Sequence, residues 1–220
     1  MPTNISVYQE CIRNLPVRNQ AFTTNRNYEK WKHIEDIFNW YQNLNNIIFD
    51  NNLTYASSRQ NLFNEQIINT EKLLKIFYWG YPKGFQGYTN NVNLISNLEL
   101  ISTELNRIKL IDNLTTNDFL QFHNWTQGID GLGISTYSKF LYFCEIRFNN
   151  IPAIILDSRL MKVFNNNIFN EYHLLNGISV NNAHNKYIDY LHLTHDLATL
   201  MNTNEENIEQ FLFIFGNNLI

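Results

Sequence analysis

Residues 129–164 read IDGLGISTYSKFLYFCEIRFNNIPAIILDSRLMKVF, and this stretch decides the fold. Three of the six residues from 128 to 133 are glycine, and apolar residues then recur at helical spacing at Ile134, Tyr137 and Leu141. Glycine is favoured where the backbone takes a positive φ or approaches another group closely. The pattern therefore predicts a tight hairpin that opens a helix, whose free N–H groups can hold a phosphate oxygen.

The second half of the stretch is an apolar run, residues 154–156, that ends in Asp157. A new helical pattern follows it at Leu160, Val163 and Phe164. Asp157 is therefore expected at a helix N-terminus, where aspartate is intrinsically favoured as a cap.

The motif Gly131-x-Gly133-x-x-Thr136, followed about twenty residues later by Asp157-x-Arg159, resembles the signature of the helix-hairpin-helix DNA glycosylases. That superfamily includes 8-oxoguanine glycosylase, the inducible alkyladenine glycosylases of bacteria and endonuclease III. By the order of its elements the resemblance extends over roughly residues 60–220. One departure is Ile129-Asp130, which stands where the family usually has Leu-Pro.

The resemblance also implies a chemical role for Asp157. Cleavage of an N-glycosidic bond gives the sugar oxocarbenium character, and a carboxylate near C1′ stabilises that charge and positions or deprotonates the attacking water. This role is compatible with the capping role. The Schiff-base lysine of bifunctional members matches Ser135, which has no amine. The resemblance therefore implies a monofunctional enzyme without AP-lyase activity.

Two basic residues near these motifs each have several alternative roles. Lys139 lies one turn beyond Ser135 and is a phosphate contact, the family's reactive amine displaced from the Ser135 position, or a solvated surface lysine. Arg159 binds a phosphate, pairs with Asp157 or forms a plain surface salt bridge. The residues expected to contact DNA are, together, Gly131, Gly133, Ser135, Thr136, Lys139 and Arg159.

An apolar helix is expected over residues 70–79, and residues 80–88 stop it with three glycines and one proline among aromatic residues. In the resembled family this loop enters the DNA stack when the target base is turned out. The base pocket or wedge is accordingly expected to contain Phe77, Trp79, Tyr81 and Gln86. The alternative is an aromatic turn that caps the core.

The rest of the chain predicts an all-α helical bundle, in which a loop poor in glycine and proline carries Asp157 after the hairpin motif. No run shows the alternation of a strand. Residues 1–56, an irregular arm and a long amphipathic helix over 28–49, are expected to pack on a glycosylase-like domain, residues 57–220. Further helices are expected over 92–108, 119–127, 160–172, 183–201 and 205–215, and residues 139–148 continue the helix that the hairpin opens. Ser58 is a candidate N-cap, residues 115–118 offer several N-cap choices for the helix over 119–127, and Thr203 with Glu206 predicts a capping box for the last helix.

Composition limits the function. The 220 residues carry a net charge of −4, which argues mildly against nonspecific nucleic-acid binding, although backbone N–H groups need few cationic side chains to hold phosphate.

No signal peptide or membrane span is evident, so a cytoplasmic protein is expected. We also expect it to be a monomer. The two cysteines lack metal spacing, and His192, His195 and Asp196 are read as surface groups rather than a metal site. No cofactor is expected, apart from room for a monovalent cation at the hairpin.

Two classes of function remain. One is a glycosylase that flips a base out of double-stranded DNA. By resemblance, compact bacterial glycosylases act against phage with modified DNA, which makes a modified cytosine, such as glucosylated hydroxymethylcytosine, a candidate substrate in antiviral defence. An oxidised or alkylated purine in base-excision repair is the other candidate. The second class is a non-catalytic module that holds DNA for a partner. Asp157 favours the enzyme, because backbone binding alone needs no carboxylate.

Overall fold

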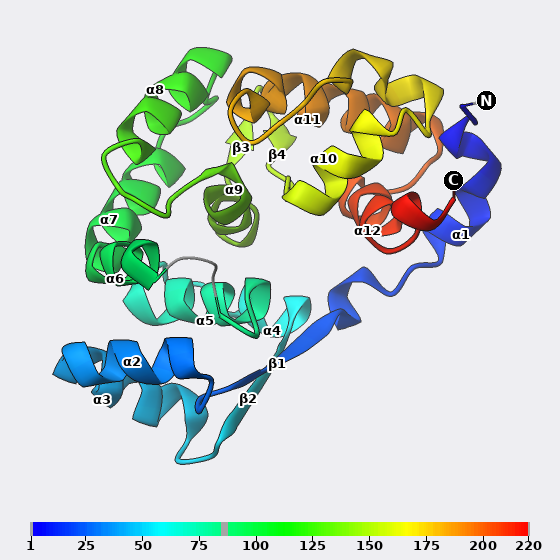
Figure 1. The fold of residues 1–220 in the computed structure, drawn as a ribbon. Helices are drawn as coiled ribbons and strands as arrows, with labels where there is room; N and C mark the ends of the chain where they lie inside the picture. Colours follow the sequence, from blue (N-terminus) through cyan, green and yellow to red (C-terminus); the bar gives the residue numbers. More distant parts are fainter. Residues whose placement is uncertain (1, 85–87, 220) are drawn as a thin grey trace.

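The structure is a computed structural model that describes residues 2–84 and 88–219 (Figure 1). The described residues are mostly helical, which confirms the expected all-α class. None of their helices is long and apolar enough to cross a membrane.

The elements, in chain order, are η1 (Ile5–Tyr8), α1 (Gln9–Arg13), η2 (Val17–Asn19), β1 (Ala21–Asn25), α2 (Glu29–Ile37), α3 (Asn39–Phe49), β2 (Thr54–Ser58), α4 (Arg59–Asn64), α5 (Thr70–Gly80), α6 (Tyr88–Ser96), α7 (Leu98–Lys109), α8 (Thr116–Thr126), α9 (Ile134–Phe143), β3 (Arg147–Phe148), β4 (Ile151–Pro152), α10 (Ser158–Asn165), η3 (Asn170–Leu175), α11 (Ala183–Leu200), α12 (Glu205–Phe215) and η4 (Gly216–Asn218).

Two helices replace the single amphipathic helix expected over residues 28–49. The chain leaves the helical conformation at Phe38, where φ is −120° and ψ is 106°, so α2 and α3 are separate. They lie below α5 in Figure 1, beside the antiparallel sheet of β1 and β2, in which Phe22 faces Ser57. Because β2 runs from Thr54 to Ser58, this sheet crosses the boundary expected at residue 56.

Helix α5 connects the parts of the fold, because it packs against β1, α7 and α9. Its apolar side chains Leu73, Leu74 and Ile76 are fully buried, as the spacing over residues 70–79 predicted. The helix expected over residues 92–108 is instead divided into α6 and α7 at Asn97, whose backbone is not helical.

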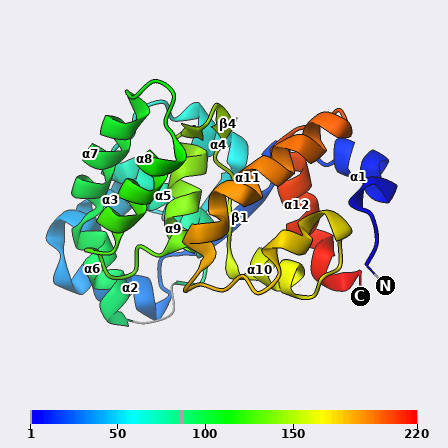
Figure 2. The same cartoon turned by 90° about the horizontal axis from the view of Figure 1, so that it is seen from above.

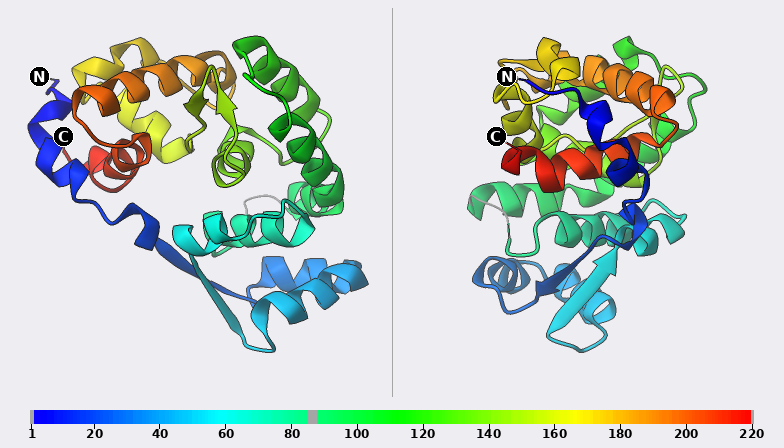
Figure 3. Two further views of the ribbon diagram at one scale, coloured as in Figure 1. Left: turned by 180° about the vertical axis from the view of Figure 1, so that it is seen from behind. Right: turned by 90° about the vertical axis from the view of Figure 1, so that its right-hand side faces the viewer.

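The N-terminal arm packs on the other end of the chain. Helix α1 contacts α12, Thr3 bridges to Phe169, and Nδ2 of Asn207 donates to the carbonyl of Ile12 at 3.0 Å. Figure 2 shows α1 beside α12 with both termini at the same end of the molecule, and Figure 3 shows the arm running from there to β1. The first twenty residues therefore join the C-terminal helices to the β1–β2 sheet.

Helix caps follow the sequence with one exception. Ser58 caps α4 and Thr115 caps α8, each through a capping box. The capping box expected from Thr203 and Glu206 is wrong, because Asn204 is the N-cap of α12 and makes no side-chain cap bond. The carboxylate of Glu206 is instead engaged by Arg18 and Tyr142.

Candidate active site

The residues expected to form the hairpin lie between α8 and α9, and Gly131 and Gly133 differ in conformation and surroundings. Gly131 has a φ of +87°, which L side chains rarely adopt. Gly133 is the N-cap of α9 with a φ of −74°, and a Cβ added there would meet no heavy atom within 4 Å. Gly131 is thus required by the turn, whereas Gly133 leaves open space in front of a helix start. The N–H groups of a first helical turn have no intrahelical acceptor, so this open end suits an anion.

Asp157 is the N-cap of α10, as predicted. Its Oδ1 accepts hydrogen bonds from the backbone N–H groups of Arg159 at 3.0 Å and Leu160 at 3.1 Å. Among the described residues, no hydrogen bond reaches Oδ2. One carboxylate oxygen therefore fixes the side chain on the helix start, and the other is available for a ligand.

Three hydroxyl groups hold the extended segment that precedes Asp157. Ser138 of α9 accepts from the N–H of Leu156 at 3.1 Å and donates to its carbonyl at 3.3 Å. On α11, Tyr187 donates to the carbonyl of Ile154 at 2.8 Å and Tyr190 to that of Ile155 at 3.0 Å. All three side chains are fully buried. These hydrogen bonds fix the backbone before Asp157 between α9 and α11.

Asp157 lines a cavity of about 150 Å³ at the meeting point of β1, α4, α5, α9 and α12. Most of its wall is apolar, and a few polar side chains converge on it, which is the usual build of a small-molecule site. Its lining residues are Gln20, Phe22, Arg59, Trp79, Gly80, Pro82, Lys139, Ile155, Asp157, Glu209 and Phe213.

Lys139 lies in the wall of this cavity and is only 5% exposed, so its reading as a solvated lysine is wrong. Its Nζ donates to the carbonyl of Ser135 at 2.5 Å and lies 4.8 Å from the centre of the Tyr81 ring. Ser135 itself occupies the first turn of α9 and does not line the cavity. The structure therefore brings Lys139, rather than Ser135, to the wall that contains Asp157.

The aromatic residues expected in the base pocket have different positions. Trp79 lines the cavity but is 4% exposed. Its ring packs between those of Phe22 and Phe143, with ring centres 5.2 and 5.0 Å away. Phe77 is fully buried against Trp31 and does not line the cavity. The hydroxyl of Tyr81 lies 3.0 Å from that of Thr136, and the ring covers the Lys139 amine.

Arg159 does not line the cavity, and Gln86 lies outside the described residues. Arg159 is exposed, with its guanidinium 4.8 Å from the centre of the Phe213 ring, and its Nη2 donates to the carbonyl of Ile214 at 3.4 Å. No ion pair between Arg159 and Asp157 occurs in the described part of the chain.

The sequence reasoning missed a buried ion pair in the cavity wall. Nη1 of Arg59 lies 2.7 Å from Oε2 of Glu209, and each side chain is 1% exposed. Burial raises the pKa of Glu209, and the positive charge of Arg59 offsets part of that rise. These residues are far apart in the sequence. The one available signal was a carboxylate within the apolar pattern of α12, next to Ile208.

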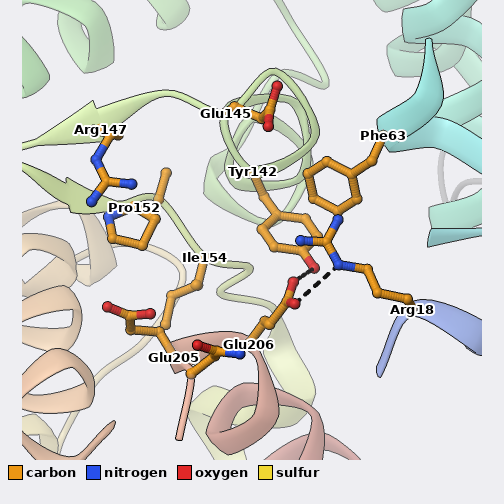
Figure 4. A pocket seen from close by; sticks show the side chains of 11 residues that line it. Arg18, Phe63, Tyr142, Glu145, Arg147, Pro152, Ile154, Glu205 and Glu206 are labelled. Carbon is orange, nitrogen blue, oxygen red and sulfur yellow. Dashed lines mark hydrogen bonds and ion pairs between the residues drawn. The ribbon is translucent and has the colours of Figure 1, made fainter. Parts of the chain in front are cut away.

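A larger cavity of about 290 Å³ is lined by Arg18, Phe63, Tyr142 and Glu206 among others (Figure 4). Figure 4 shows Glu206 held between Arg18, at 3.0 Å, and the Tyr142 hydroxyl, at 2.7 Å. The same hydroxyl accepts from Nη1 of Arg59 at 3.0 Å. The larger cavity therefore contains neither Asp157 nor Lys139, but its polar wall holds Arg59 in position.

The histidines named with Asp196 do not converge. His195 Nδ1 lies 2.7 Å from a carboxylate oxygen of Glu205, whereas His192 Nε2 lies 3.3 Å from Asn149. Within residues 2–84 and 88–219, no group of three or more potential ligands could hold a metal ion.

Comparison with known proteins adds one finding. A family model described as "Putative 8-oxoguanine DNA glycosylase OGG-like protein" matches residues 16–213, which is most of the chain. No curated protein and no solved structure matches it.

Proposed function

Because the chain belongs to the OGG-like family of 8-oxoguanine DNA glycosylases, we propose that it excises a damaged or modified base from duplex DNA at the cavity lined by Asp157. The reaction is hydrolysis of the N-glycosidic bond. Asp157 stabilises the oxocarbenium character that develops at C1′ and takes a proton from the attacking water.

The observation that carries this proposal is that the two oxygens of the Asp157 carboxylate differ in their hydrogen bonds. Oδ1 is used for capping α10, while Oδ2 has no hydrogen-bond donor among the described residues. The cavity beside it is lined by flat aromatic side chains, including Trp79 and Phe213. A module that only held DNA would need the open hairpin but not a carboxylate at a cavity, so the enzyme is favoured over the non-catalytic alternative.

The substrate is proposed to be a modified cytosine of phage DNA, with oxidised or alkylated purines as the alternative. The cavity volume of about 150 Å³ is close to that of engineered cavities that hold benzene. It therefore suits the ring of a single base. A glucosyl group on hydroxymethylcytosine would have to extend beyond the enclosed space.

A second candidate activity is cleavage of the DNA strand by β-elimination of the 3′ phosphate from the sugar, and it rests on the position of Lys139. Lys139 lines the same cavity as Asp157, although the family position for a lysine is Ser135. If the amine attacked C1′, the base would leave and an imine would join Lys139 to the sugar. Hydrolysis by Asp157 alone would leave an intact abasic site.

One experiment separates these outcomes. The chain is incubated with phage DNA containing normal, hydroxymethylated or glucosylated cytosine, and with duplexes containing 8-oxoguanine, and abasic sites are counted with an aldehyde-reactive probe. We expect abasic sites in at least one modified DNA. Borohydride in the same reaction should trap no adduct if the enzyme is monofunctional, and an adduct that Lys139→Gln abolishes would assign the lyase. Absence of abasic sites and of adducts from every DNA would contradict the glycosylase proposal.

A further inference from the structure

The cavity contains an ion pair whose burial calls for an explanation. Arg59 is the first residue of α4 and Glu209 lies in the middle of α12, and both are 1% exposed in a wall otherwise formed largely by Phe22, Trp79 and other apolar residues. Removing two charges from water is costly, and apolar replacements of such pairs are often as stable. A few polar groups in an apolar pocket, in contrast, are what orients a bound ligand.

The guanidinium of Arg59 is only partly used by the protein. Its Nε donates to Oε1 of Gln20 at 2.7 Å, and its Nη1 donates to the Tyr142 hydroxyl and contacts Glu209. An arginine has five N–H donors. Among the described residues, no acceptor is paired with its Nη2, so two N–H donors of a cavity-lining side chain remain without a protein partner.

The neighbouring groups complete a donor and acceptor set. The amide nitrogen of Gln20 makes no hydrogen bond to the described residues, and neither does Oε1 of Glu209. Both residues line the cavity with Arg59. The wall thus offers donors from Arg59 and Gln20 next to an acceptor from Glu209.

We propose that Arg59 and Glu209 read the hydrogen-bonding edge of the extruded base and select bases in which a keto oxygen accompanies an N–H or amino group. This inference rests on the proposed base excision. Glu209 accepts from the N–H or amino group, and Arg59, together with Gln20, donates to the keto oxygen. A keto oxygen has two lone pairs and accepts from both donors. Guanine-type and cytosine-type bases present such an edge.

Adenine-type bases fit this wall poorly. Unmodified adenine has an amino donor but no oxygen, and a ring nitrogen accepts only one hydrogen bond. A buried donor would then lose its partner, and sites built to pair with an oxygen reject ligands that lack it. We expect at least about tenfold discrimination, the lower end of what one unmatched buried polar group causes.

The test compares hypoxanthine with adenine, which share the purine ring and differ only at C6 and N1. Hypoxanthine has a keto oxygen beside an N–H group, and adenine has an amino group beside a bare ring nitrogen. Each is offered as the free base, with binding followed by protein NMR and calorimetry. We expect the wild-type chain to bind hypoxanthine at least about tenfold more tightly than adenine. Free-base binding does not require catalysis, so absence of excision from every duplex would reject the proposed function while the binding comparison still decides the inference.

Variants assign the discrimination to the pair. Arg59→Met combined with Glu209→Leu replaces both residues by apolar ones and removes both charges together, and thermal melting checks that the double variant is folded. It should bind the two bases equally. The matched control is Arg26→Met with Glu35→Leu, which removes a less buried ion pair that does not line the cavity, and it should keep the wild-type ratio. The inference is overturned if wild type binds adenine as tightly as hypoxanthine, if neither base binds at millimolar concentration, or if the Arg59/Glu209 double variant keeps the preference.

Discussion

Lys139 packs against the backbone of Gly80 so closely that a Cβ on Gly80 would lie 2.7 Å from Cδ and 2.9 Å from Cε of the lysine. Both residues line the cavity that contains Asp157. The lysine stem therefore occupies the space that a side chain at position 80 would take, and the place of its amine depends on that glycine.

Gly80→Ala should therefore disturb the site without unfolding the chain. Alanine in a helix is favoured over glycine by about 0.5–1 kcal/mol, which offsets part of the cost of moving the lysine. We expect the free energy of unfolding to change by less than about 1 kcal/mol, while single-turnover excision falls about tenfold or more because small displacements at a reacting centre are costly. Gly128→Ala, whose Cβ would meet its nearest atom at 3.5 Å, is the control. Unchanged excision by Gly80→Ala would show that the Lys139 position is irrelevant.

Gly133→Val tests whether the hairpin holds a phosphate. Because no protein atom lies within 4 Å of the added Cβ, stability should fall by no more than about 1 kcal/mol, from the weaker N-cap. Affinity for DNA should fall equally for every sequence, with the excised base unchanged. Gly133→Ser adds a preferred cap, so its loss of affinity cannot come from unfolding. Fluorescence anisotropy that shows wild-type affinity for both variants would place the phosphate elsewhere.

The salt dependence of binding belongs to the same test. If backbone N–H groups carry much of the contact, the slope of log affinity against log salt should correspond to roughly three to four neutralised phosphates. A much steeper slope would indicate an extended cationic surface instead.

His123 makes the stability of the hairpin region depend on pH. Its ring stacks on that of His184 at 4.0 Å, and burial together with the charge of His184 lowers the pKa of His123 below its ordinary 6.5. The unfolded chain then binds a proton that the folded chain does not, so stability is lost as the pH falls below about 6.5. His123→Gln should lose less stability than wild type between about pH 8 and pH 5.5 in urea unfolding. Equal losses would contradict this assignment.

Tyr142→Phe removes the hydroxyl that joins Arg59 to Glu206. Two buried or half-buried charged groups lose a partner, so we expect a loss of about 1–3 kcal/mol in the free energy of unfolding. Tyr28→Phe, at an exposed ring, should stay within about 0.5 kcal/mol of wild type. Denaturant unfolding of the two variants compares them directly. A Tyr142→Phe chain as stable as the control would show that the hydroxyl does not hold Arg59.

The features predicted from sequence are those with a local signal. The positive φ at Gly131 and the N-cap at Asp157 depend on neighbouring residues, and both occur in the structure. The breaks at Phe38 and Asn97 have no such signal, because the apolar spacing continues through them.

Contacts between distant parts of the chain had no such signal. The strands of the β1–β2 sheet are too short for their alternation to stand out, and Arg59 meets Glu209 only through the docking of α12. Lys139 was assigned no definite role because sequence spacing places it on a helix face but does not show that Gly80 leaves room for its stem.

The most direct test of the account is single-turnover excision by Asp157→Asn on the DNA that wild type cleaves best. Asparagine caps helices as well as aspartate does, so α10 and the fold should be retained. The matched control is Asp118→Asn, which changes the exposed carboxylate of the α8 capping box. We predict that Asp157→Asn binds the DNA normally but excises its base about three orders of magnitude more slowly, while Asp118→Asn excises normally. Excision by Asp157→Asn within tenfold of wild type would contradict the assignment of Asp157 as the catalytic carboxylate.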